Sequence, residues 1–133
     1  MEEHSELVRY RLEMARATLR DALLLKEQGG SPWGIVNRAY YAMFYATLAL
    51  LTLVGKGTSK HGGVIALFDQ YFVKTGNLPQ EMSKWLHKAF DMRQIGDYRE
   101  LVVITEDQVE EILGWAKEFV REIEVYLDNK LQN

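Results

Sequence analysis

The sequence has no cysteine in its 133 residues, so it can form neither a disulfide framework nor a thiolate site. This fits an intracellular protein, and we expect a cytoplasmic location. The sequence also lacks a basic excess, because its net charge is −3 and its pI is near 5.6. That balance argues against a dedicated binder of duplex DNA, although it leaves room for a local basic patch.

Secretion and membrane signals are equally scarce. The N-terminus, Met1-Glu2-Glu3-His4-Ser5-Glu6, is acidic and has no apolar signal-peptide core. Residues 39–54 form a run of sixteen without charge, which is short of the roughly twenty that span a bilayer. Three tyrosines in the first half of this run also favour a helix buried in protein. We therefore expect no membrane association and, from the length, a single domain over residues 1–133.

Apolar residues recur at helical spacing along most of the chain. The pattern predicts an all-α fold, an up-and-down antiparallel bundle of five helices with no sheet. Ser31 before Pro32 is a typical helix start, and Thr105 with Gln108 forms a capping box. The expected helices run from Ser5 to Gln28, from Ser31 to Val54, from Ser59 or Lys60 to Gly76, from about Pro79 to Gly96, and from Thr105 to the C-terminus.

The predicted second helix is apolar on nearly every side over residues 37–51. A helix without a polar face must be covered all round, by its own chain or by a partner. We therefore expect this helix at the centre of the bundle and in contact with a second copy of the chain. Its entrance is polar, and Asn37 and Arg38 either line a cleft or only cap the packing.

Arg93 continues the apolar stripe of the predicted fourth helix, so it should point towards the core or an interface. Asp97 follows four residues later, which is the spacing of an arginine–carboxylate pair on one helix face. The pair is either a structural salt bridge at the helix end or part of a site.

Lys60 and His61 stand at the start of the predicted third helix, where free N–H groups attract anions. They could hold a phosphate, or they could belong to a solvated helix start whose glycines permit close packing. The preceding Gly55-Lys56-Gly57-Thr58 lacks the spacing of a phosphate-binding loop, so it is read as an interhelical loop. The three histidines have no metal-ligand spacing, and we expect no metal site.

Three segments together resemble the HEPN domain family, and most closely its small, single-domain prokaryotic branch. These are Asn37-Arg38-Ala39-Tyr40-Tyr41-Ala42-Met43-Phe44, then Ser59-Lys60-His61-Gly62-Gly63-Val64, and Arg93 with Asp97-Tyr98. The resemblance implies a bundle of four to five helices that forms a two-fold homodimer. It also implies a small nucleotidyltransferase as partner, often in a toxin–antitoxin pair.

Active toxins of this family are metal-independent ribonucleases that use an Arg, a neighbouring polar residue and a His four to six residues after the Arg. Arg93 matches the arginine and Gln94 the polar residue, whereas Asp97 and Tyr98 stand where the histidine is expected. The resemblance thus implies Arg93, Asp97 and Tyr98 as catalytic candidates, with Tyr98 also a candidate acceptor of a nucleotide from the partner enzyme. Asn37, Arg38, Lys60 and His61 remain candidates for binding nucleotide or phosphate.

The resemblance leaves two functions open. The first is a homodimeric regulatory partner of a nucleotidyltransferase that binds nucleotide or RNA in its cleft. The second is a metal-independent ribonuclease toxin with a diverged site. The missing histidine favours the first, and neither function calls for a cofactor.

Overall fold

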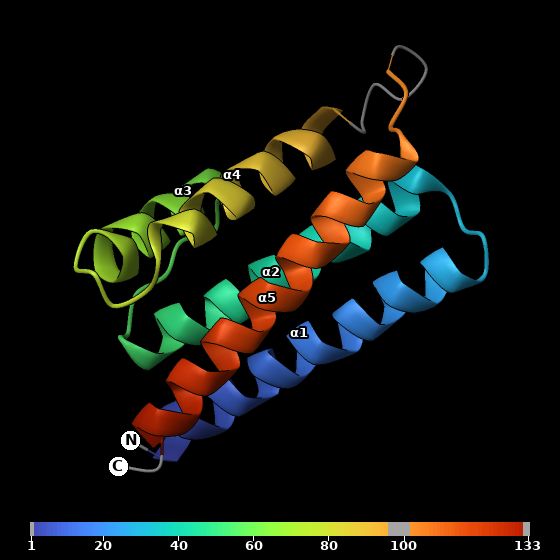
Figure 1. Ribbon diagram of the computed structural model, residues 1–133. Helices are drawn as coiled ribbons and strands as arrows, with labels where there is room; N and C mark the ends of the chain where they lie inside the picture. The colour runs from blue at the N-terminus through green and yellow to red at the C-terminus, as the bar shows by residue number, and fades with distance from the viewer. Residues whose placement is uncertain (1, 96–101, 132–133) are drawn as a thin grey trace.

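The computed structural model describes residues 2–95 and 102–131 (Figure 1). Within these residues the chain forms five α-helices and one π-helical segment, and no strand. The predicted all-α bundle of five helices is therefore confirmed. The elements are α1 (Glu2–Glu27), α2 (Pro32–Leu53), α3 (His61–Phe68), η1 (Asp69–Val73), α4 (Gln80–Ile95) and α5 (Glu106–Leu131).

Helix α2 is the central element of the bundle. Figure 1 shows it between α1 on one side and α4 on the other, with α5 lying across it, and all three helices contact it. Thirteen of its residues are buried, including Tyr40, Met43 and Leu50. The prediction that this apolar helix lies at the centre of the bundle is confirmed, whereas Tyr41, Tyr45 and Leu48 stay half-buried within the single chain. No helix in the described ranges has both the length and the apolarity needed to cross a membrane.

The predicted helix boundaries at the two strongest capping signals are confirmed. The Ser31 hydroxyl accepts a hydrogen bond from the Gly34 N–H at 3.0 Å at the start of α2. At the start of α5 the Gln108 N–H donates to the Thr105 hydroxyl at 3.1 Å, and the Thr105 N–H donates to the Gln108 side chain at 2.9 Å. These bonds satisfy N–H groups that a helix start would otherwise leave unpaired.

The third helical segment differs from the prediction. It was expected to continue as one α-helix to Gly76, but α3 ends at Phe68 and the wider π-helical turn η1 follows. The Lys74 N–H donates across this turn to the Asp69 carbonyl oxygen at 2.8 Å. Phe68 and Phe72 both stay in the core through the turn. Apolar spacing alone predicts that the segment is buried, and it does not distinguish an α from a π turn.

Candidate functional site

Two arginines from different helices contact the ring of Tyr41 in α2. Arg93, in the last turn of α4, donates from Nη2 to the Tyr41 hydroxyl at 3.2 Å. Its guanidinium carbon lies 5.6 Å from the Tyr41 ring centroid, and that of Arg38 lies 5.4 Å from the same centroid. Contacts of this kind stabilise a cation by about 0.5–1 kcal/mol at exposed sites. The ring therefore fixes the positions of two positive charges.

Neither guanidinium is neutralised by an acid in the part of the chain that the structure describes. Arg93 and Arg38 form no ion pair there. Arg38 donates from Nε and Nη2 to Oδ1 of the neighbouring Asn37, at 3.1 and 2.9 Å. Because a guanidinium has five N–H donors, both arginines keep donors for a further partner. Both side chains are half-buried, which makes an anionic partner favourable.

His61, the first residue of α3, lies next to the same aromatic side chains of α2. Its Nδ1 lies 2.9 Å from the hydroxyl oxygen of Tyr40, and its ring stacks on Phe44 with 4.2 Å between centroids. Tyr40 is fully buried, and this is the hydrogen bond that satisfies its hydroxyl group. The guanidinium of Arg93 also lies 5.9 Å from the Tyr40 ring centroid. We call the following five residues the arginine–tyrosine cluster: Arg38, Tyr40, Tyr41, His61 and Arg93.

The pKa values of two rings in the cluster, Tyr40 and His61, are shifted in the direction that favours their neutral forms. Burial raises the pKa of Tyr40 far above its ordinary value, and the charge of Arg93 offsets this only in part. Burial lowers the pKa of His61, and Arg93 lowers it further because two positive charges repel. With Tyr40 as hydrogen-bond donor to Nδ1, the neutral imidazole carries its hydrogen on Nε2. His61 then has a free N–H donor on Nε2, on a ring that is close enough to Arg93 to feel its charge.

The structure brings together most, but not all, of the candidate site residues. Arg93, Arg38 and His61 belong to the cluster, and Asn37 is joined to it through Arg38. Lys60 is exposed, and its side chain has no hydrogen bond, ion pair or ring contact within the described chain. Asp97 and Tyr98 lie outside the described residues.

Tyr40 and Tyr41 were not predicted as site residues, although Tyr41 is the side chain on which both arginines converge. The spacing of Arg38 and Tyr41, three residues apart on one helix, is a signal that could have indicated their contact. Across residues 2–95 and 102–131 the side chains that commonly bind metals form no group of three or more that could hold an ion.

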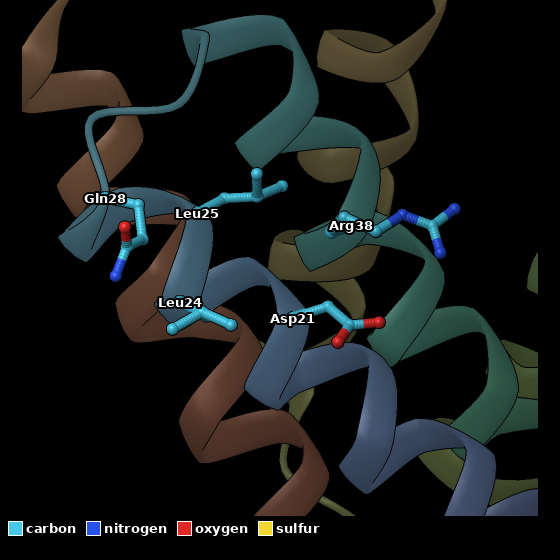
Figure 2. A pocket seen from close by; sticks show the side chains of 5 residues that line it. All are labelled: Asp21, Leu24, Leu25, Gln28 and Arg38. Atoms are coloured by element: carbon cyan, nitrogen blue, oxygen red, sulfur yellow. The ribbon is translucent and has the colours of Figure 1, made fainter.

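Arg38 also borders a groove between α1 and α2 (Figure 2). The groove has a volume of about 380 Å³. Its lining residues are Asp21, Leu24, Leu25, Gln28 and Arg38. Since Arg38 contacts Tyr41 as well, the groove and the arginine–tyrosine cluster share one side chain.

The fold and the cluster define a class of protein: a small all-α bundle in which Arg38 of the central helix and Arg93 of α4 meet on one tyrosine ring, with no ion pair to either arginine among the described residues. The chain belongs to the HEPN domain family, whose sequence model matches residues 8–126. The family suggested by the sequence resemblance is thereby confirmed.

Similar proteins agree with this assignment. A Thermotoga maritima protein named "UPF0332 protein" is 40% identical over 130 residues, which cover 97% of each chain. A Methanocaldococcus jannaschii protein named "Putative toxin MJ0142" is 34% identical over 95 residues, covering 71% of this chain and 65% of that protein. A second protein of that organism, "Putative toxin MJ0605", is 36% identical over 88 residues, covering 66% of this chain and 65% of that protein.

Proposed function

We propose that this HEPN protein binds RNA or a free nucleotide by its phosphates, as the toxin-type member of a two-protein system. One observation carries the proposal: Arg38 and Arg93 lie on the same tyrosine ring with no ion-pair partner among the described residues. Guanidinium groups with unused N–H donors suit the geometry of phosphate oxygens. The neutral imidazole of His61 adds a donor without adding charge.

The partners belong to the same proposal. Two relatives carry the word toxin in their names, which supports a toxin-type role for this chain. The family resemblance adds a small nucleotidyltransferase as partner and a homodimer as the active form. Tyr41, Tyr45 and Leu48 remain half-buried along one side of α2, and a second copy could cover them.

A second candidate, a metal-independent ribonuclease, is favoured by the position of His61. In this candidate His61, from a different helix, would supply the imidazole that is missing after Arg93 in the sequence. In such a reaction a base removes the proton of the RNA 2′-hydroxyl, whose oxygen attacks the adjacent phosphorus. The phosphorus–O5′ bond then breaks, and the leaving 5′-oxygen takes up a proton.

The hydrogen bond of Tyr40 favours the binding of RNA or nucleotide over the cleavage of RNA as the proposed function. For His61 to act as a base at Nε2, its hydrogen must sit on Nδ1 and be donated to the Tyr40 oxygen. The buried Tyr40 hydroxyl would then need another acceptor, and the described residues offer none within hydrogen-bond distance. The tautomer that satisfies Tyr40 makes His61 a donor to a phosphate.

The proposal is tested by the Arg93→Ala variant. We expect its affinity for a fluorescently labelled single-stranded RNA of twelve nucleotides, measured by anisotropy in EDTA, to fall about tenfold or more, the loss of one charged hydrogen bond. Arg121→Ala is the matched control, because Arg121 is exposed on α5 outside the cluster and should leave affinity unchanged.

Circular dichroism of both variants checks that each remains folded. An unchanged affinity in folded Arg93→Ala would contradict the proposed function. The same samples run on a denaturing gel test the second candidate. Cleavage by the wild-type protein in EDTA that is lost in His61→Ala would favour the ribonuclease over a protein that only binds RNA.

A further inference from the structure

The groove between α1 and α2 has the size and position of a second binding subsite. Its volume of about 380 Å³ falls in the range of small-molecule pockets, roughly 300–1,000 Å³. Arg38 lines the groove and also stacks on Tyr41. A phosphate held by Arg38 would therefore place the rest of its nucleotide at the mouth of the groove.

The floor of the groove is apolar. Leu24 is 54% exposed at its edge, and Leu25 packs against the core beside it. Figure 2 shows Leu24 and Leu25 leaving successive positions of α1 in different directions, with Leu25 turned towards α2. Such a surface suits a planar, weakly polar ring, because stacking removes apolar area from water on both partners.

The rim of the groove carries an unpaired acid. The Asp21 carboxylate lies on the same side of the groove as the Arg38 guanidinium (Figure 2), yet the two form no ion pair. The exposed side chain of Asp21 has no hydrogen-bond partner in the described part of the chain. An ionised carboxylate can only accept hydrogen bonds, so its ligand must present donors.

We propose that this groove binds the nucleobase of the nucleotide whose phosphate Arg38 holds, with guanine as the preferred base. This inference rests on the proposed function. Guanine presents two adjacent donors, N1–H and the 2-amino group, which one carboxylate can accept together. Adenine presents an unprotonated N1 at the equivalent position, and that acceptor would face the Asp21 carboxylate. Single-stranded RNA bases are commonly recognised on this edge.

The test compares guanosine, inosine and adenosine 5′-monophosphates by isothermal titration calorimetry. Inosine monophosphate keeps N1–H and lacks the 2-amino group. We expect the guanosine nucleotide to bind about tenfold more tightly than either of the others. Asp21→Ala should abolish this preference, whereas Asp128→Ala, an exposed acid near the end of α5, should retain it.

Leu24→Ala tests the apolar floor separately. It should weaken all three nucleotides alike, because stacking does not distinguish the bases by their hydrogen-bonding edges. Leu7→Ala is its control, an exposed leucine on the same helix that does not line the groove.

Three results would overturn the inference, and each points to a different conclusion about the groove. Equal affinity for the three nucleotides, with RNA binding that still depends on Arg93, would disprove the base subsite and leave the proposed function standing. No binding of RNA or of any nucleotide would disprove both. A changed sedimentation coefficient in Asp21→Ala or Leu24→Ala, with nucleotide preference unaltered, would show that the groove is instead a contact between two copies of the chain.

Discussion

Among single residues, His61 combines a structural contact with a proposed role as a hydrogen-bond donor to phosphate. Its ring is stacked on Phe44 and hydrogen-bonded to Tyr40, so it can leave its place only if a buried hydroxyl loses its partner. Its position could not be predicted from sequence, because 32 residues separate it from Arg93 and only the packing of α3 against α2 brings them together. The inward direction of Arg93 could be predicted, since it followed from the phase of one helix.

The lowered pKa of His61 predicts how stability depends on pH. As the pH falls, the His61 side chain of the unfolded protein is protonated near pH 6.5, whereas that of the folded protein is protonated only at lower pH. The free energy of unfolding should therefore fall as the pH drops below about 7. His61→Gln should show a smaller fall between pH 7 and 5.5 in urea denaturation. His4→Gln, exposed near the start of α1, should retain the wild-type dependence. Equal pH dependence in His61→Gln and wild type would count against a depressed pKa.

At the scale of helices, the sequence was most informative where local chemistry decides the structure. Helix α5 begins where the capping box of Thr105 and Gln108 predicts, because those bonds need only residues within one turn. The end of α3 was predicted wrongly. The turn at Asp69–Val73 keeps Phe68 and Phe72 packed against α5, and such long-range contacts cannot be inferred from the local sequence. Phe68 lies 5.4 Å from Phe119 and Phe72 lies 5.7 Å from Tyr126, between ring centroids, and both partners are on α5.

The capping box gives a prediction for α5. Thr105→Ala removes the hydroxyl that accepts from the Gln108 N–H, and we expect it to lower the free energy of unfolding by about 1 kcal/mol. Urea denaturation measures the loss. Thr105→Ser keeps a hydroxyl at the same place and should lose much less. Equal losses in the two variants would show that the threonine methyl group, and not the cap, matters.

For the whole molecule, the five helices leave part of the apolar surface uncovered. Tyr45 and Leu48 continue the half-buried side of α2 that begins at Tyr41, and Tyr10 of α1 is 62% exposed. A two-fold dimer would place the same surface of each copy against the other. The homodimer expected from the sequence therefore remains a prediction with a physical motive.

We expect sedimentation velocity at micromolar concentration to show a dimer. Tyr45→Glu should shift it to monomer, because the interface would bury an unpaired charge. Val125→Glu, on an exposed position of α5, should leave the dimer intact. Circular dichroism distinguishes dissociation from unfolding. A wild-type protein that sediments only as monomer would remove the basis for a two-fold site.

Two residues of the arginine–tyrosine cluster lie at helix ends, and this has a consequence for its dynamics. His61 is the first residue of α3 and Arg93 lies in the last turn of α4, whereas Arg38 lies inside α2. Helix ends generally open at a lower free energy than helix interiors, so we expect His61 and Arg93 to open more readily than Arg38. An anion that bound all three would order both ends at once, and part of its binding energy would be used to suppress their motion.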